Sequence, residues 1–557
     1  MDQGVKRIYC GANQIICSLG DSTENVVDAI CHYETNLRQF KDGTTIYLID
    51  KQNIDTSNLE DYTFTEQLAI CAIRDVIKKS GVALNSARTA LVISTTKGNI
   101  DCIKSDFQRS FLHVMGNKIA NYFEYKKTPI IVANACISGI TAIGVASRMI
   151  EQDEIDNAFV VGVDTINDFV VSGFNSFKSI SPSVCRPYDA NRDGLTAGEG
   201  CGVLLLTNKK DLSSYNIELS GYAMTDDACH ISAPSRTGDG LFYAIDKAMK
   251  NAGVEKNDIA FINAHGTATL YNDEMESRAI HWAELDNVPC NSLKPYIGHT
   301  FGASGVIETI LSIEAMARNI VFGVKGYEIS GVPFPLNISS KHRTTNVNHC
   351  LKTASGFGGT NAAIVLSKVN DSKRRVIKNI DCEISECAKI SLKSKGGTAS
   401  EELKTEYKDL ADVNLKFYKM SNLSKLGYVA SCKMLKGIEL PFEHDRVAVI
   451  LASRSSSLDT DLIHQKNVDK NIQEEVSPAI FVYTLANIVA AEIAIKHKFQ
   501  GESTTFIMEN KDMDFLKKYA RLRILQDECD AVVYGWCELL KNDYEVELKL
   551  ITKNGNS

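Results

Sequence analysis

One cysteine and two histidines in this chain stand where strands are expected to end, and small residues flank each of them. Cys136 follows the apolar stretch 130–133, and His265 follows the apolar stretch 259–264. His299 stands between a glycine and a threonine in a glycine-rich turn. A thiol can attack a carbonyl carbon, and imidazoles can move protons or stabilise an oxyanion. Together these residue types predict nucleophilic acyl chemistry.

The turn around Cys136 is made of small residues, which allow a tight bend and a close approach by a substrate: Ala133, Ala135, Ser138 and Gly139. A thiol at the N-terminus of a helix faces unpaired N–H groups and the positive end of the helix macrodipole, and both favour the thiolate. We therefore expect an activated nucleophile at Cys136. A buried, inert cysteine is the alternative interpretation of this stretch taken alone.

Four loops next to apolar strands carry the reactive residues: those at Cys136, His265 and His299, and the Gly-Phe-Gly-Gly turn at 356–359. A single histidine more often has a structural role. Two glycine-flanked histidines together with a cysteine at a strand-to-helix turn favour a reactive site instead. Because ligands of α/β sheets collect at the C-terminal ends of strands, these loops are expected to converge.

The elements that must position these loops alternate along the chain. Strands are expected at 90–94, 129–133, 158–164, 203–206, 259–264 and 362–366, and helices at 65–79, 107–123, 142–150, 240–252, 273–282 and 306–318. Fully apolar strands that alternate with helices predict an α/β fold with a parallel-rich sheet covered on both faces. Residues 351–361 are expected to form a loop. The glycine-rich segment 186–202 lacks the ending of a phosphate loop and precedes a strand, so it does not indicate a nucleotide site.

Length and composition describe a globular protein of two to four structural units, with 557 residues, 44% hydrophobic and 23% charged, and a net charge of −8. No basic stripe indicates a nucleic acid partner. We see no signal peptide, and no apolar run approaches the roughly 20 residues that span a bilayer. None of the 16 cysteines forms a Cys-x-x-Cys pair, so neither a zinc site nor a disulfide framework is predicted. We expect a cytoplasmic protein with reduced thiols.

Five motifs in one order resemble the β-ketoacyl-[acyl-carrier-protein] synthase family, whose members carry a Cys-His-His triad on the thiolase fold. The motifs are Asn-Ala-Cys-Ile-Ser-Gly at 134–139, Arg-Pro-Tyr-Asp at 186–189 with Asp-Gly at 193–194 and Gly-Glu-Gly at 198–200, Asn-Ala-His-Gly-Thr at 263–267, the segment from Lys294 through His299 to Gly-Ala-Ser-Gly at 302–305, and Gly-Phe-Gly-Gly-Thr-Asn at 356–361. The resemblance covers residues 4–368.

The resemblance implies a thiolase-like α/β fold, in which duplicated halves build an α-β-α-β-α layered structure. Residues 1–225 would form the half with the nucleophilic cysteine, and residues 226–370 the half with the two histidines. Residues 371–557 would form a third unit that resembles the first half and lacks catalytic residues.

The resemblance also implies roles for the reactive residues. Cys136 would be the nucleophile that takes the acyl chain from a carrier-protein thioester. His265 and His299 would surround the thioester carbonyl of a malonyl-type substrate and stabilise the enolate that decarboxylation creates. Lys294 would act electrostatically on the histidines, and Glu308 would be its ion partner rather than a surface residue.

The implied oxyanion hole consists of the backbone N–H groups of Cys136 and Phe357. Phe357 stands between Gly356 and Gly358 and resembles the family's gating aromatic residue. In the loop that follows the first histidine, Asp273 is retained as a supporting residue.

The chain departs from the family pattern in two places. The loop 269–273 replaces the family's Thr-Pro-x-Gly-Asp with Thr-Leu-Tyr-Asn-Asp. The stretch 101–129, which shapes the acyl pocket and the dimer contact in the family, is shorter than usual. Asp226, Asp227 and His230 match a further family segment near the cleft. We assign them no catalytic role.

The C-terminal third looks like a degraded second copy of the first half. Four segments match in the same order: 376–382 with 5–10, 448–459 with 90–101, 505–512 with 130–137, and 523–535 with 148–162. In this alignment Lys511 falls at the position of Cys136, and the copy ends before either histidine has a counterpart. A chance match between strand–helix–strand units is the alternative. We expect the copy to imitate the family's dimer surface, either by packing on the catalytic unit or by recruiting another subunit.

The predicted function is decarboxylative condensation of an acyl-enzyme with a malonyl thioester, in fatty acid, polyketide or aryl-polyene-type biosynthesis, without a metal or organic cofactor. The expected partners are acyl carrier proteins that carry acyl and malonyl groups, and a second subunit in a homodimer or heterodimer. Three alternatives are a non-condensing partner subunit like the chain-length factors, a thiolase-like acyl transferase that uses coenzyme A, and a scaffold built on the C-terminal copy.

Overall fold

The computed structural model describes residues 6–369, 380, 382–410, 412–470 and 476–554. The expected boundary at 370–375 and most of the matched segment 376–382 lie outside these residues. None of the helices in the described ranges combines the length and the apolar character that crossing a bilayer requires.

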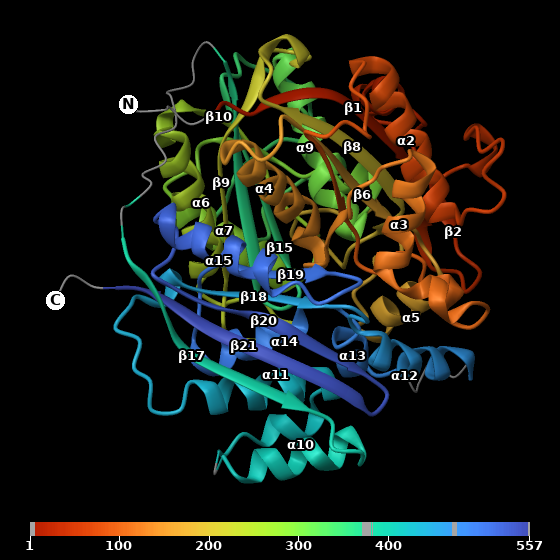
Figure 1. Ribbon diagram of the computed structural model, residues 1–557. Coiled ribbons are helices and arrows are strands. Elements are labelled where there is room, and N and C mark those ends of the chain that lie inside the picture. The colour runs from red at the N-terminus through yellow and green to blue at the C-terminus, as the bar shows by residue number, and fades with distance from the viewer. Residues whose placement is uncertain (1–5, 370–379, 381, 411, 471–475, 555–557) are drawn as a thin grey trace.

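The first part of the chain builds a sheet with helices on its outer face (Figure 1). In spatial order its strands are β1 (Tyr9–Cys17), β8 (Gly200–Thr207), β6 (Asn157–Asp164), β4 (Thr89–Ser94) and β5 (Ile130–Val132). β6, β4 and β5 are parallel, and β8 is antiparallel to both β6 and β1. The helix α2 (Phe64–Ser80) begins with a capping box of Thr63 and Glu66 and covers β1, β8 and β6.

The second part builds a similar sheet beside the first. Its strands in spatial order include β9 (Ile217–Asp226), β16 (Thr360–Lys368), β15 (His349–Gly356), β10 (Ile259–Asn263) and β11 (Pro289–Asn291). The helix α6 (Asp239–Ala252) covers β9, β16 and β15 and packs on α7 (Leu270–Trp282). The pair Tyr9 and Glu218 joins β1 to β9 at the seam between the two sheets.

Two helices, α4 (Ser138–Glu151) and α9 (Ser304–Arg318), lie between the sheets and contact strands of both. They cross so closely that a Cβ on Gly139 would lie 2.6 Å from the backbone N of Val306. A Cβ on Gly305 would lie 2.5 Å from the backbone N of Ile140. Only glycine fits at both crossing points. The layers follow the predicted α-β-α-β-α order: outer helices, a sheet, the central helix pair, a second sheet and further outer helices. This order confirms the thiolase-like fold.

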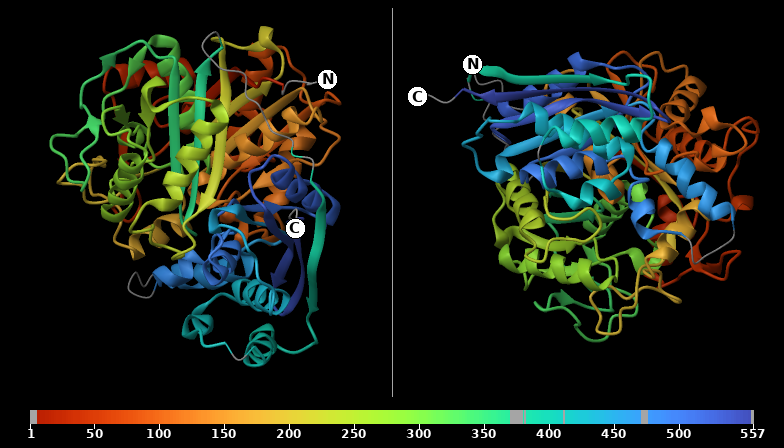
Figure 2. Two further views of the ribbon diagram at one scale, coloured as in Figure 1. Left: turned by 90° about the vertical axis from the view of Figure 1, so that its left-hand side faces the viewer. Right: turned by 90° about the horizontal axis from the view of Figure 1, so that it is seen from below.

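The C-terminal part extends the first sheet beyond β5 (Figure 2). From β5 outward its strands are β19 (Ser503–Ile507), β18 (Val447–Ser453), β20 (Ala531–Leu540), β21 (Asp543–Lys553) and β17 (Ile384–Lys393). The join is antiparallel, with Phe506 opposite Val132 and Ile507 opposite Ile131. The helices α11 (Asn422–Met434) and α14 (Ile488–His497) cover its outer face, whereas α15 (Met513–Leu525) shares an apolar cluster with α4.

Buried charges hold the C-terminal part, here called the C-terminal unit (residues 384–554), against the rest of the chain. Arg148 of α4 pairs with Glu502 at 2.7 Å and with Glu528 at 2.9 Å. Lys97, in the loop after β4, pairs with Asp461 at 2.8 Å, and both side chains are almost fully buried. Since a buried charge without its partner is costly, these pairs require the two surfaces to stay together.

Most predicted elements are present, and the clearest differences concern three segments. The helix expected at 142–150 begins earlier, at Ser138, immediately after the cysteine turn. The segment expected as one helix at 107–123 is a 3₁₀ turn at Phe107–Ser110 followed by α3 (Leu112–Tyr122). The loop expected at 351–361 is wrong, because β15 and β16 pair as a hairpin there. Its polar residues had indicated a loop, but they sit in strands that run into the site.

Candidate active site

Cys136 lies in a sharp turn between β5 and α4. Ala135, immediately before it, has a left-handed backbone with φ of +47°, and the 3₁₀ turn Ala135–Ile137 leads into the helix. The Asn134 N–H donates to the Ser138 hydroxyl at 2.7 Å. The Asn134 side chain accepts from the Thr505 N–H of the C-terminal unit at 2.8 Å. A strained, over-determined turn of this kind holds the thiol at a fixed position.

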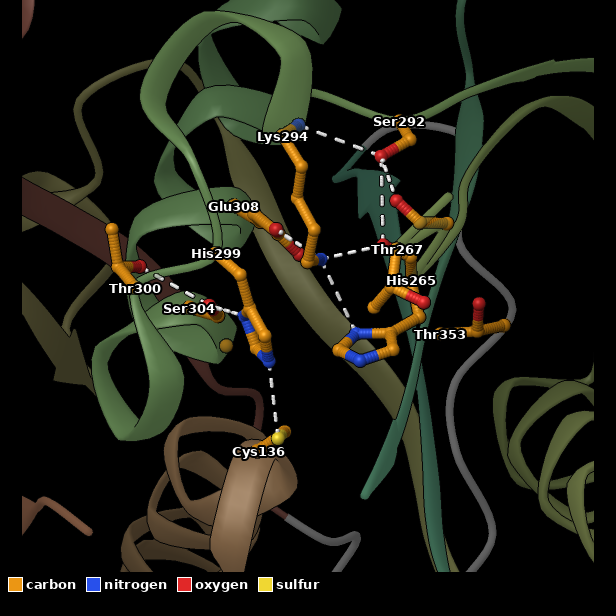
Figure 3. Close-up of polar contacts among 12 residues, drawn as sticks. Cys136, His265, Thr267, Ser292, Lys294, His299, Thr300, Ser304, Glu308 and Thr353 are labelled. Carbon is orange, nitrogen blue, oxygen red and sulfur yellow. Dashed lines mark hydrogen bonds and ion pairs between the residues drawn. The ribbon is translucent and has the colours of Figure 1, made fainter. Parts of the chain in front are cut away.

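The structure brings Cys136, His265 and His299 together (Figure 3). Cys136 Sγ lies 3.1 Å from His299 Nε2. The two imidazole rings meet edge to face, with centroids 5.2 Å apart. A thiol and two imidazoles from three separate loops therefore line one small volume, as expected from the strand ends that carry them.

His265 is held in one tautomer by Lys294. The ammonium nitrogen of Lys294 lies 3.3 Å from His265 Nδ1. Because an ammonium group can only donate, Nδ1 must accept, and the proton of the neutral ring is carried by Nε2. His265 therefore presents an N–H donor on the ring edge opposite Lys294.

His299 has a more adaptable neighbour. Its Nδ1 lies 3.0 Å from the Ser304 hydroxyl, which is 3.1 Å from the Thr300 hydroxyl. A hydroxyl can donate or accept, so either tautomer of His299 is supported. His299 Nε2 can therefore accept the proton of Cys136 and can afterwards act as a donor.

A buried row of three charges lies behind the histidines. Glu308 of α9 is 2.7 Å from Lys294 and 2.5 Å from Lys352, and all three side chains are fully buried. Burial alone would raise the pKa of Glu308, but the two lysines hold it below its ordinary value. Burial lowers the pKa of Lys352. With both lysines charged, the row carries one net positive charge next to the imidazoles.

Lys352 is a site residue that the sequence reasoning missed, because residues 351–361 were expected to form a loop. It lies on β15, whose ladders with β10 and β16 bury the strand. The available signal was Lys352 itself, which directly follows the apolar pair Cys350 and Leu351. A lysine there must meet a buried anion.

The expected thiolate at Cys136 is wrong, because the pKa of the thiol is raised. Burial raises the pKa of Cys136 to about 12, although Lys294 acts in the opposite direction. Burial also lowers the pKa of both His265 and His299 well below the ordinary value, and Lys294 adds to this effect. Near neutral pH the site therefore holds a neutral thiol beside neutral imidazoles, because desolvation outweighs the helix terminus.

The Gly-Phe-Gly-Gly turn, here called the gating loop (residues 356–359), closes over the cysteine. The backbone N–H groups of Phe357 and Cys136 both interact with the Cys136 sulfur and lower its pKa. A Cβ on Gly356 would lie 3.1 Å from the Cys136 nitrogen, and Gly358 has a φ of +94°. Phe357 stacks on Phe177 with ring centroids 5.5 Å apart. The glycines thus permit a turn that brings two backbone donors to the sulfur.

Two carboxylates of α7 shape the loop that carries His265. Asp273 accepts from the Thr267 N–H at 3.1 Å and from the Tyr188 N–H at 2.7 Å, and burial raises its pKa to about 7. Glu276, which the sequence reasoning did not single out, accepts from the His265 N–H at 2.7 Å. Asp273 thus lies where a supporting residue was expected, and Glu276 provides a second anchor.

The segment around Asp226 and Asp227 supports the gating loop. The Asp227 N–H donates to the Gly359 carbonyl at 2.7 Å, and the Gly358 N–H donates to the Ile231 carbonyl at 2.7 Å. Burial raises the pKa of Asp227 to about 7. His230 is exposed and bonds within its own loop.

The C-terminal unit also reaches the gating loop, which the sequence reasoning missed. Asn487 donates from its side-chain nitrogen to the Phe357 carbonyl at 2.8 Å. Phe481, on α13 (Pro478–Val482), meets Phe174 edge to face with centroids 5.2 Å apart. The only signal in the sequence was the matched copy itself, which predicts a nearby surface and no particular residue.

The three reactive groups could in principle hold a metal ion, because their ligand atoms all lie within 4.8 Å of one another. A cation would have to displace the thiol proton and sit next to the net positive charge of Lys294, Glu308 and Lys352. That charge favours an anion, or a group on which negative charge develops, in the same place.

Comparisons with known proteins agree with this geometry. Residues 52–211 match the family model of the β-ketoacyl synthase N-terminal domain, and residues 217–327 match that of the C-terminal domain. 3-Oxoacyl-[acyl-carrier-protein] synthase 2 of Rhizobium meliloti is 34% identical over 253 residues, which cover 42% of this chain and 60% of that protein. The protein of the same name from Coxiella burnetii is 25% identical over 352 residues, which cover 57% of this chain and 85% of that protein. The match to the Rhizobium relative thus spans less than two thirds of its length.

Solved structures extend the likeness to the C-terminal unit. A ketosynthase from Xenorhabdus doucetiae, solved in complex with its chain length factor, is 26% identical with a TM-score of 0.60 and covers 65% of this chain and 98% of its own. The structure of PfaC, a keto synthase–chain length factor, covers 99% of this chain and 79% of its own with a TM-score of 0.81 and 13% identity. At that identity the second likeness concerns the fold alone.

Proposed function

Since the chain belongs to the β-ketoacyl synthase family, we propose that it condenses an acyl thioester with a malonyl thioester, both delivered by acyl carrier protein, and releases CO₂. The observation that carries the proposal is the Cys136 thiol 3.1 Å from His299 Nε2, with His265 facing the same space. The product would be a 3-oxoacyl thioester on the carrier. The complete set of reactive groups argues against a non-condensing partner subunit.

The first step would be transfer of the acyl group to Cys136. The sulfur attacks the thioester carbonyl while His299 Nε2 accepts the thiol proton, so no free thiolate has to exist beforehand. The N–H groups of Cys136 and Phe357 would hold the oxyanion of the tetrahedral intermediate. When the intermediate collapses, the carrier thiol leaves with the proton that His299 holds.

The second step would be decarboxylation of the malonyl group. Breaking the bond to the carboxylate releases CO₂ and leaves an enolate on the thioester oxygen. The Nε2–H of His265 and the Nε2–H of His299 would donate to that oxygen. The net positive charge of the lysine–glutamate–lysine row behind the histidines would stabilise the enolate further.

In the last step the enolate carbon attacks the acyl-Cys136 carbonyl, with the oxyanion again at the two backbone donors. Collapse forms the 3-oxoacyl thioester and expels the Cys136 thiolate, which takes up one proton to restore the resting thiol. No metal or organic cofactor enters this proposed sequence, because the thiol and imidazoles supply the nucleophile and the donors.

We further propose that the C-terminal unit takes the place of a second subunit at the β5 edge and supplies no nucleophile. Its β19 pairs with β5, so a homodimer could not form through the same strand edge. A partner other than the carrier protein would have to bind elsewhere. We place the reaction in the cytoplasm, as the sequence analysis expects.

Covalent trapping tests the proposed function. Incubation with an acyl-loaded carrier protein should add the acyl mass to the intact protein, and peptide mapping should place it on Cys136. Prior treatment with cerulenin should block that transfer. Mixing the acylated protein with malonyl carrier protein should then give a 3-oxoacyl product and CO₂. Absence of an adduct on Cys136, with carriers shown to be loaded, would contradict the proposal.

A further inference from the structure

A polar contact joins the C-terminal unit to the gating loop. Asn487 precedes α14, and its side-chain nitrogen donates to the Phe357 carbonyl at 2.8 Å. Asn487 is fully buried. A carbonyl can only accept, so the orientation of the amide is fixed by this bond. Its side-chain oxygen has no hydrogen-bond partner among the described residues.

The gating loop and the start of α14 approach each other closely around that contact. A Cβ on Gly358 would lie 2.6 Å from the Asn487 side-chain nitrogen and 3.3 Å from the Ala491 Cβ. The gating loop and the start of α14 are therefore in direct contact. Since Gly358 and Gly359 have φ of +94° and +79°, the loop has backbone freedom that an outside contact must remove.

The other side of the loop is supported from the same unit. Phe481 packs so closely on α5 (Asp168–Ser176) that a Cβ on Gly173 would lie 2.2 Å from its ring. Phe174 stacks on Phe357 with ring centroids 6.3 Å apart. Lys97 donates to the carbonyl of Thr484 and thereby fixes the segment that carries both contacts. The loop thus rests on a packed surface that the C-terminal unit helps to form.

We propose that Asn487 is a positioning residue for condensation. Asn487 holds the Phe357 carbonyl and thereby fixes the gating loop, whose Phe357 N–H would bind the oxyanion. The C-terminal unit would then contribute to the active site by positioning this donor, although it provides no reacting group. This inference rests on the proposed function. The role is specific to steps that use the backbone donors, which are acyl transfer to Cys136 and carbon–carbon bond formation. Decarboxylation relies on the histidines and should not need it.

The test compares those steps in the full-length protein. Asn487→Leu keeps the approximate size and removes the donor, and Asn487→Ser keeps a shorter donor. Removing one oxyanion donor costs about 10²–10³-fold in rate, so partial misplacement by Asn487→Leu should slow Cys136 acylation about 10- to 100-fold. CO₂ release from malonyl carrier protein should stay within about twofold, since it depends on the histidines. Asn542→Ala, in the β20–β21 turn of the same unit, is the matched control.

Acylation is followed by intact mass after rapid mixing, and CO₂ release by a coupled assay, at equal thermal stability of the variants. Acylation at the wild-type rate in both variants would overturn the inference. A parallel fall of acylation and CO₂ release would also overturn it, because that pattern describes a merely structural contact. If the wild-type protein itself neither acylates nor releases CO₂, the proposed function fails, and the inference fails with it.

Discussion

The first half of the chain and the C-terminal unit have the same sheet in mirrored order. From the outside inward they read β1-β8-β6-β4-β5 and β17-β21-β20-β18-β19. Every step has the same sense in both: the outer two pairings are antiparallel and the inner two are parallel. The two inner edges then pair with each other. The C-terminal unit has no counterpart of the second sheet among the described residues. It therefore resembles the half that carries the cysteine and has no counterpart of the half that carries the two histidines.

The likeness extends to the loop after the central strand. In the first half, the Thr95 hydroxyl donates to Asp164 and accepts from the Gly98 N–H. In the C-terminal unit, the Ser453 hydroxyl donates to Glu538 and accepts from the Ser456 N–H. Gly98 and Ser456 both have positive φ, of +50° and +55°. The predicted match of 448–459 with 90–101 therefore agrees with the structure at these two pairs of positions.

The likeness ends at the nucleophile turn. Ser94 pairs with Val132, and Ala452, the residue that corresponds to Ser94, pairs with Phe506, so counting four residues on from each partner places Asn510 level with Cys136. The predicted register, with Lys511 there, is wrong by one residue.

The turn that follows β19 is also different. Ala135 is left-handed, whereas residues 508–512 include none with positive φ, and Asp512 caps α15 in the ordinary way. A buried sheet needs only apolar residues and backbone pairing, but a strained turn needs particular residues that a unit without a nucleophile does not require.

The largest expected effect comes from removing the nucleophile, which the first half has and the C-terminal unit lacks. Cys136→Ala should abolish the acyl adduct and lower condensation by about 10⁴-fold or more, because no other group replaces the nucleophile. Asn510→Ala, at the corresponding place in the C-terminal unit, should leave the rate unchanged. Both are measured as steady-state product formation with loaded carrier proteins. An adduct that persists in Cys136→Ala would place the nucleophile elsewhere.

A smaller effect tests whether the two regions form one cooperative body. Arg148→Met would leave Glu502 buried without its main partner and should lower the free energy of unfolding by about 3–5 kcal/mol. Lys247→Met is the matched control, because Lys247, on α6 of the second half, also pairs with the C-terminal unit, at Asp445, while both side chains remain partly exposed. That change should cost about 0–1 kcal/mol. Urea unfolding measures both, and equal losses would contradict a buried, ordered interface.

What could be predicted from the sequence depends on how far apart along the chain the interacting residues lie. The strands that end at Cys136 and His265 and the helices between them follow from local periodicity, so the convergence of the reactive loops was predictable. Lys352 was missed because its strand is polar where it enters the site and therefore looks like a loop. Asn487 lies 130 residues from its partner Phe357, in a unit whose placement no local pattern determines.

The protonation state of the site was out of reach for a similar reason. Local sequence places Cys136 near a helix N-terminus, which favours the thiolate. The opposing desolvation comes from side chains of every loop around it, and its size depends on tertiary packing. Only the assembled site reveals which effect is larger.

The smallest expected effect is a flat pH dependence of Cys136 acylation, which distinguishes Cys136 from Cys432, a partly buried cysteine of the C-terminal unit. Burial raises the pKa of Cys136 to about 12 and that of Cys432 to about 11. Alkylation of either by iodoacetamide should therefore rise about tenfold per pH unit between pH 6.5 and 9, because only the thiolate reacts.

Acylation of Cys136 by a loaded carrier protein should instead vary by less than about twofold over the same range. The sign follows from both pKa shifts: a raised thiol pKa and a lowered His299 pKa keep both groups neutral throughout, and the proton passes between them only during attack. A thiolate–imidazolium pair would have the opposite shifts and would lose activity in acid as the thiolate is protonated. The expectation would be wrong if the acylation rate fell in acid with an apparent pKa near 7 while Cys432 alkylation kept its tenfold change per pH unit. That result would show that the Cys136 turn stabilises the thiolate.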